Sequence, residues 1–208
     1  RSTVTERDLL PMSRGALRGP LPIDAQGRCT SIAVGTYAND HHYPGEDWPL
    51  APKSVRWGGR WSGTPFCIPF DALISDAIPN LVMAEKGFSV SHMANGATRL
   101  QPLILNLGQV AGLAAAMAVR QGCDLGDLAV ESIQSALIHE PKAPAAVLPI
   151  WDWPHWHPHW VTAQEQGLAQ PEHLAAMGCL SGTEASMLMP PGMNLSLIHI
   201  SEPTRQAT

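Results

Sequence analysis

The sequence predicts an α/β fold in which short strands pack against helices. Three observations favour this class: a β-prone run at 31–37, a short apolar run at 81–84 that suits a buried parallel strand, and an apolar helix from near Pro102 to about Gln121. The chain has 208 residues, and 45% of them are hydrophobic, which is ordinary for a packed globular protein. This length allows one domain or parts of two.

The N-terminal third is predicted to consist of strands and turns. Residues 1–28 are rich in Gly, Pro and Arg and show no clear period. The β-prone run at 31–37 is followed by a loop at 39–45, and between 53 and 74 strand-forming residues are interrupted by glycines. We therefore expect residues 1–78 to form part of a β-rich domain.

Two helices are predicted in the second half of the chain. Pro102 suits the first turn of a helix, because its missing N–H has no intrahelical partner there, and Gly122 can cap the C-terminus. A second helix is expected over 125–138, with Asp124 or Asp127 as its N-cap. Its apolar residues lie close to one stripe, which indicates one buried face.

Residues 141–194 are predicted to form a Pro- and Trp-rich C-terminal extension. Three histidines at alternating positions would share one face of an extended strand, where they could bind zinc or copper: His155, His157 and His159. Pro154 and Pro158 interrupt such a strand, and tryptophans surround it. We therefore expect an aromatic cluster here and no metal site.

Both ends of the sequence are unusual. It begins at Arg1 without a methionine, as if taken from a longer reading frame. Near the other end, 195–205 reads LSLIHISEPTR, which is the translation of a transposase adapter used in sequencing libraries. We therefore leave residues 195–208 out of the fold prediction as an adapter artefact. The alternative is a natural amphipathic tail.

Composition and charge argue against several classes of function. A net charge of -5 gives no support to nucleic acid or an anionic membrane as partner. The four cysteines include no CxxC pair, which argues against a zinc site or a redox dithiol. Their low density, and an N-terminus that does not resemble a signal peptide, favour a cytoplasmic location.

The stretch from 80 to 122 is the most informative for function. Small residues recur along one face of the predicted helix, at Gly108, Ala111, Gly112 and Ala115. Such a face lets another backbone or a flat ligand approach closely. The helix start presents unpaired N–H groups and the positive end of the helix dipole, and Arg99 adds a positive charge beside it. Together these features can hold an electron-rich ring.

Two other interpretations of this helix are open. The small residues can serve only for close packing of the helix on a sheet, since a lone GxxxG pattern is a weak signal. The mostly apolar run from 103 to 119 could instead cross a membrane, but Asn106 and Gln109 interrupt it, and it is shorter than the ~20 residues of a span.

Several motifs in this stretch follow one another in a recognisable order. Ala-Glu-Lys at 84–86 ends the predicted strand, a Ser-His loop follows at 91–92, then Arg99, and then the helix segment LGQVAGLAA at 107–115. This order resembles the C-terminal part of FAD-dependent oxidoreductases with the glutathione-reductase type of flavin fold, among them the heterodisulfide-reductase-like flavoproteins. The similarity extends from about residue 37 to about residue 158.

The resemblance implies FAD as cofactor and a flavin-mediated redox step on an unidentified small organic substrate. Residues 1–78 would be part of the substrate domain, and 79–140 the C-terminal part of an FAD-binding Rossmann-like domain. The phosphate-binding fingerprint GxGxxG is absent from the sequence, so a missing N-terminal part of the same chain would supply it. We therefore expect this chain to be inactive alone and not to retain FAD. Some relatives carry a 4Fe–4S cluster, and no cysteine here has the spacing of its ligands.

The resemblance also assigns residues to the site. The helix start would lie beside the pyrimidine side of the flavin, where reduction places negative charge. The implied cofactor-binding residues are Glu85, Arg99, Gln101, Pro102, Leu103, Ile104 and Gly108. Among these, the carboxylate of Glu85 would take a ribityl hydroxyl.

The candidates for substrate chemistry are His92, Arg99, His41 and His42. A histidine can move the proton that accompanies hydride transfer, and an arginine can clamp a carboxylate. The alternative function is a non-catalytic structural or binding module in which the Gly/Ala helix serves only for packing.

Overall fold

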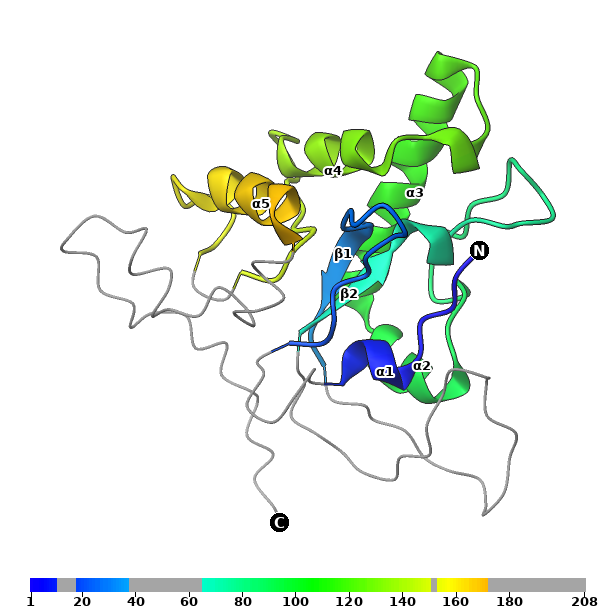
Figure 1. Ribbon diagram of the computed structural model, residues 1–208, viewed down its shortest axis with the longest axis horizontal. Coiled ribbons are helices and arrows are strands. Elements are labelled where there is room, and N and C mark those ends of the chain that lie inside the picture. The colour runs from blue at the N-terminus through cyan, green and yellow to red at the C-terminus, as the bar shows by residue number, and fades with distance from the viewer. Residues whose placement is uncertain (11–17, 38–64, 151–152, 172–208) are drawn as a thin grey trace, which may run out of the picture.

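The computed structural model describes residues 1–10, 18–37, 65–150 and 153–171, which combine helices with a small antiparallel sheet. In chain order the elements are α1 (Glu6–Leu9), β1 (Ser31–Gly35), β2 (Phe66–Pro69), the 3-10 turn η1 (Phe70–Ala72), α2 (His92–Thr98), α3 (Gln101–Gln121), the 3-10 turn η2 (Leu125–Asp127), α4 (Val130–Ile138) and α5 (Trp160–Ala169). Figure 1 shows the strands at the centre with α3 behind them, α4 and α5 towards one end and α1 and α2 at the other. This mixture of helix and sheet is compatible with the predicted α/β class.

The sheet consists of β1 and β2, and both strands are almost entirely buried. The predicted strand at 31–37 is confirmed over its first five residues. Gly35 pairs with Phe66 across the sheet. A Cβ atom at Gly35 would lie only 2.4 Å from the Phe66 ring and 3.1 Å from the Leu103 side chain on α3. The absence of a side chain at this position therefore allows β1 to pack directly against the helix.

The long helix α3 forms where it was predicted, with Pro102 in its first turn and Gly122 as its C-cap. Gly122 adopts the left-handed conformation (φ 64°), which a glycine reaches without steric cost. One stripe of the helix is buried against β1 and α4, and it includes Leu103, Leu107, Val110 and Ala114. Spacings of three and four residues put these side chains on a single face.

The opposite face of α3 is apolar and open, since Leu105 is 73% and Val119 83% exposed. In the described part of the chain, α3 is long and apolar enough to cross a membrane. Of the most apolar 18-residue stretch of this helix, 39% is buried in the protein. A core helix that packs on a sheet meets the same criteria, so length and composition do not distinguish the two roles.

The predicted buried strand at 81–84 is wrong. Val82 forms only an isolated antiparallel bridge with Ile74, and Leu81 and Ala84 are exposed. The Met83 N–H donates to the Leu73 carbonyl at 2.8 Å, which ties the run to the end of η1. Because no strand in the described ranges pairs with it, the apolar run is a loop and not a strand of a sheet.

The predicted Ser-His loop at 91–92 is also wrong, because these residues begin helix α2. Ser91 is the N-cap, and its Oγ accepts a hydrogen bond from the Ala94 N–H at 3.1 Å. The same hydroxyl donates to the Glu6 carboxylate at 3.1 Å, which docks α2 on α1. The helix was missed because Gly96 lies in its interior, where glycine lowers helix propensity.

The second predicted helix begins later than expected. Residues 125–127 form the 3-10 turn η2, and α4 begins at Val130 with Ala129 as its N-cap. Asp124 precedes η2 without a side-chain cap hydrogen bond, so the predicted Asp124 or Asp127 cap is wrong. The predicted apolar stripe of this helix is nevertheless buried.

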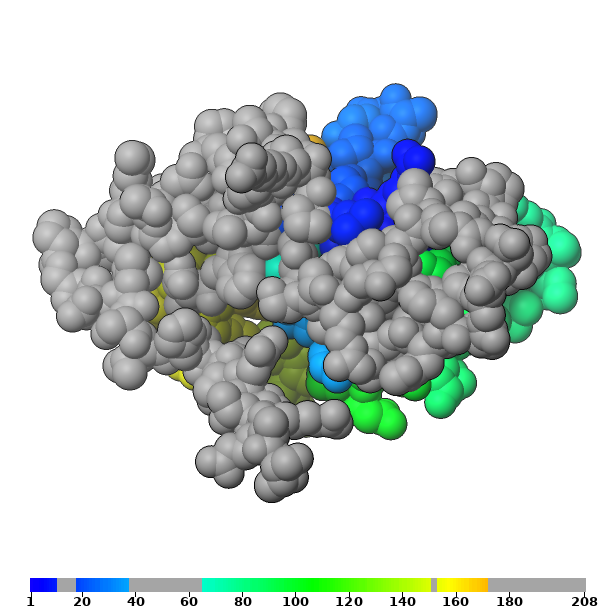
Figure 2. All heavy atoms as spheres, turned by 90° about the horizontal axis from the view of Figure 1, so that it is seen from below, coloured from blue at the N-terminus to red at the C-terminus, as the bar shows by residue number. Residues whose placement is uncertain are grey.

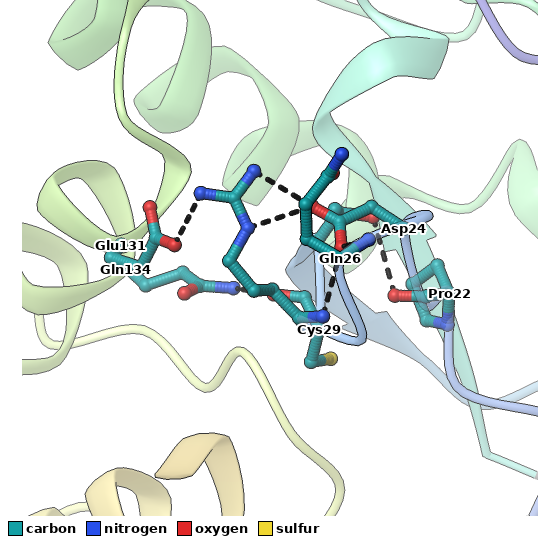
Figure 3. A network of polar contacts seen from close by, with 8 residues as sticks. Pro22, Asp24, Gln26, Cys29, Glu131 and Gln134 are labelled. Atoms are coloured by element: carbon teal, nitrogen blue, oxygen red, sulfur yellow. Dashed lines mark hydrogen bonds and ion pairs between the residues drawn. The ribbon is translucent and has the colours of Figure 1, made fainter.

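A polar network joins α4 to the segment that leads into β1 (Figure 3). The buried side-chain amide of Gln134 donates to the carbonyl oxygens of Cys29 at 2.7 Å and Ser31 at 2.8 Å. Nearer the surface, the Arg28 guanidinium donates to the Glu131 carboxylate at 2.9 Å. Gln134 and Glu131 lie about one turn apart on α4, so the helix is held to this segment at two points.

The C-terminal extension contains helix α5, which the sequence analysis did not predict. Its buried Gln164 accepts hydrogen bonds from the N–H groups of Val147 at 3.1 Å and Leu148 at 2.9 Å, and donates to the Leu148 carbonyl at 2.8 Å. One amide side chain thus satisfies three backbone groups that would otherwise be buried without partners. Residues 172–194 lie outside the described ranges, so the structure assigns them no role.

We predict that Gln134→Leu lowers the free energy of unfolding by about 2 kcal/mol, because two buried carbonyl oxygens lose their donor. Urea unfolding followed by circular dichroism measures the effect. Gln166→Leu, on the exposed side of α5, is the matched control. Equal unfolding midpoints for the two variants would show that the Gln134 amide adds no net stability.

Candidate functional site

The corner between α2 and α3 contains two of the residues expected beside a flavin ring. Arg99 is the C-cap of α2 and has near-helical angles (φ −80°, ψ 3°), whereas Leu100 is the extended N-cap of α3 (φ −79°, ψ 145°). The change of backbone conformation between them turns the chain from one helix into the next. Arg99 and Gln101 therefore lie on either side of a turn at the surface.

A pocket of about 310 Å³ lies at this corner. Its lining comes from the end of β1, the loop after the run at 81–84, and the corner itself: Tyr37, Lys86, Arg99, Leu100 and Gln101. Figure 2 shows the light-blue residues that follow β1 next to the bright-green start of α3 on one face of the molecule. Of the residues assigned from the sequence, the pocket brings Arg99 and Gln101 together.

The charges around this pocket favour an anionic or electron-rich ligand. Its lining contains the cations Lys86 and Arg99 and no carboxylate among the residues that the structure describes. The start of α3 adds the positive end of the helix dipole, and Leu100 has no side chain that could cap it. By contrast, α2 is capped from within by Ser91. The N–H groups in the first turn of α3 therefore receive no side-chain cap from the N-cap residue.

Five of the implied cofactor-binding residues do not line the pocket: Glu85, Pro102, Leu103, Ile104 and Gly108. Leu103 is buried in the core against Gly35, so its side chain cannot face a ligand. Glu85 is exposed beside Lys86, but only the lysine belongs to the lining.

The small residues of α3 divide between packing and open surface. A Cβ atom at Gly108 would lie 3.5 Å from the Ala84 carbonyl oxygen, and Ala111 is buried. Gly112 and Ala115 are exposed, and a Cβ at Gly112 would meet nothing within 4 Å. Gly108 and Ala111 therefore face packed parts of the protein, whereas Gly112 and Ala115 face open surface.

The structure does not bring His92 and Arg99 together. They stand at opposite ends of α2, which separates them by about 10 Å of helix rise. His92 is exposed and does not line the pocket. The other two candidate histidines, His41 and His42, lie outside the described residues.

The alternating histidines of the C-terminal extension form part of an aromatic cluster. The ring of His157 stacks on Trp153, with centroids 4.7 Å apart and an angle of 7° between the ring planes. His159 lies at the edge of this stack. Within the described ranges, no group of three His, Cys, Asp or Glu residues could hold a metal ion.

The cysteines of the described residues are free thiols. Cys29 and Cys67 are buried, and burial raises the pKa of the Cys29 thiol to about 11. Cys29 is therefore protonated at neutral pH, which makes it a poor nucleophile and a poor cluster ligand.

Sequence reasoning missed Lys86 and Tyr37 as pocket residues. Glu85 and Lys86 are adjacent charges in one turn, and the sequence does not show which of them faces the helix. Tyr37 lay at the end of a predicted strand, where a side chain can point either way. The sequence did contain one signal for a pocket at this corner. Leu100 stands at the N-cap of α3, where most helices have Ser, Thr, Asp or Asn.

Cations beside the N-terminus of a helix favour the binding of an anionic or electron-rich group. The family model described as FAD dependent oxidoreductase matches residues 1–137, which is more than half of the chain. The chain therefore belongs to the FAD dependent oxidoreductase family. No curated protein and no solved structure matches it.

We predict that the stability of the aromatic cluster falls as the pH is lowered through 6.5. Burial, and then the nearby His159, lower the pKa of His157 from its ordinary value of 6.5. The unfolded chain therefore takes up a proton at a higher pH than the folded one, so acid favours unfolding until the folded pKa is passed. The melting temperature of wild type, relative to His157→Asn, should decrease on acidification.

His155→Asn is the control for this measurement, because His155 is exposed and lies edge-on to Trp156, away from the Trp153 stack. A difference between wild type and His157→Asn that does not change with pH would contradict the prediction.

Proposed function

We propose that the pocket at the start of α3 binds the pyrimidine edge of the FAD isoalloxazine ring, and that the protein uses the flavin in a redox step on a small organic substrate. The observation that supports this most directly is the convergence of Lys86, Arg99 and an uncapped helix start on one pocket. A purely structural role for the Gly/Ala helix explains its packed side but not these converging positive charges.

The residues of the pocket fit the chemistry of that ring edge. Its carbonyl oxygens and ring nitrogens accept or donate hydrogen bonds, and Arg99 offers planar donors while the Gln101 amide offers both kinds of group. FAD, when bound, supplies hydride acceptance and donation. The chain's own residues orient the ring and stabilise negative charge beside it.

On the substrate side, Arg99 is a better candidate than His92, because it lines the pocket. A guanidinium in this position can clamp a carboxylate of the substrate. Proton transfer would fall to Tyr37, which also lines the pocket, or to His41 and His42.

The phosphates of FAD would be held elsewhere. The sequence contains no GxGxxG fingerprint, which in a Rossmann-like fold binds the pyrophosphate. We therefore propose that a further, N-terminal part of the same polypeptide supplies this half of a glutathione-reductase-type flavin domain, and that the complete enzyme works in the cytoplasm.

The proposed ring site predicts that riboflavin perturbs the backbone amide signals of Lys86, Arg99 and Gln101 in NMR spectra of the chain. Arg99→Met should weaken the binding about fivefold, as expected for the loss of a hydrogen bond worth about 1 kcal/mol. Signals at Arg120 and Gly122, at the other end of α3, serve as the internal control. Shifts confined to that end would exclude the assigned pocket.

FAD should not remain bound to the chain through desalting, because the proposed pocket contacts only the ring. FAD and riboflavin are expected to bind with similar affinity, as measured by flavin fluorescence. Retention of flavin absorbance after desalting would refute the proposal that the phosphate site lies elsewhere.

A further inference from the structure

A pocket of about 420 Å³ lies between α4, α5 and the turn that leads into β1. The residues that α4 contributes to it are spaced three or four positions apart, so they share one face of the helix: Glu131, Gln134, Ser135 and Ile138. The volume falls in the range of about 300–1,000 Å³ that is usual for small-molecule sites. Its lining shares no residue with the pocket at the start of α3, so the two are separate pockets.

One wall of this pocket lies beyond the part of the chain that matches the flavoprotein family. The match ends at residue 137, whereas helix α5 contributes Glu165 and Leu168 to the lining. This helix is fixed in place by the buried Gln164, whose amide bonds to the backbone of Val147 and Leu148. The family match therefore does not account for the pocket, although its α5 wall is firmly attached to the rest of the protein.

The α4 wall contains a buried acceptor that lacks a donor. Gln134 is only 1% exposed, and its amide nitrogen is committed, because it donates to the carbonyl oxygens of Cys29 and Ser31 (Figure 3). Within the described ranges, no group donates a hydrogen bond to its side-chain oxygen. Buried polar atoms are nearly always paired, and an unpaired one is costly. Because Gln134 lines the pocket, a ligand there can supply the missing donor.

The charges around the pocket favour a cation. Its lining, among the residues that the structure describes, carries one cation, Arg28, and two carboxylates, those of Glu131 and Glu165. Two carboxylates already neutralise Arg28, since it donates to Asp24 at 2.8 Å and to Glu131 at 2.9 Å. In the described part of the chain, Glu165 pairs only with His139, at 3.3 Å, and that histidine offsets its charge only when protonated. An added cation is therefore stabilised beside Glu165.

We propose that this pocket binds a small organic amine, with Glu165 as the counter-ion, the Gln134 oxygen as a hydrogen-bond acceptor and the apolar body against Ile138 and Leu168. The N–H groups of an ammonium ion can donate to a carboxylate and to an amide oxygen. The two lining residues Ile138 and Leu168 offer apolar surface from both helices. A carboxylate or phosphate ligand would bring negative charge towards two carboxylates and offer no donor to Gln134. The inference does not depend on the proposed flavin site.

The test is an NMR titration of the whole chain with phenethylamine, and with phenylpropionate as an anionic counterpart of similar size. The amine should shift the backbone amide signals of Ser135, Ile138 and Leu168 in a saturable manner, and the anion should not. Glu165→Gln should weaken amine binding about two- to fivefold, as expected for a partly exposed charge pair. Ala169→Trp should abolish binding by filling the pocket, and the fold should tolerate it because Ala169 is exposed.

Asp127→Asn is the matched control, since it removes a carboxylate from an exposed position of η2 that does not line the pocket. An equal loss of affinity in Asp127→Asn and Glu165→Gln would reveal only a general attraction to the negative protein and would overturn the role of Glu165. Absence of saturable shifts at the three amides, or unchanged affinity in Ala169→Trp, would overturn the amine site itself. Neither result bears on the flavin site, which lies in the other pocket.

Discussion

The close contact of β1 with α3 at Gly35 sets the geometry on which the pocket depends. The missing side chain at Gly35 lets the Phe66 ring and Leu103 close the space between sheet and helix. Tyr37 lies two residues beyond this contact on the strand side, and Gln101 two residues before it on the helix side, so the contact brings both to one place. Burial of Phe66 and Leu103 stabilises the arrangement by roughly 1.5–3 kcal/mol each.

The two helices that meet at the corner differ in how the N–H groups of their first turns are capped. The start of α2 is satisfied internally, because Ser91 caps it and also bonds to Glu6. The N-cap of α3 is Leu100, whose side chain cannot accept a hydrogen bond. The first turn of α3 therefore has no side-chain cap from its N-cap residue, at the corner where Lys86 and Arg99 also lie.

The parts of the fold that depend on local signals could be predicted from the sequence. Helix α3 was found because its Pro, its Gly and its apolar period agree over 21 residues. Helix α2 was missed because Gly96, in its interior, lowers the helix propensity of the segment. The run at 81–84 was misassigned because a run of apolar residues does not show whether a partner strand exists. Arg99 and Gln101 could be placed from their position at the start of a helix. Lys86 reaches the pocket only through the packing of a loop on α3, which is a tertiary contact.

The Gly35–Phe66 pair also constrains how this protein could diverge. A Cβ at position 35 would overlap the ring of residue 66, so a larger residue at one position requires a smaller one at the other. We therefore expect the effects of such substitutions to be non-additive, with each harmful alone and tolerated in combination. Among homologues, residues 35 and 66 should therefore exchange size in a correlated manner, and this covariation would trace the sheet-to-helix contact directly from sequences.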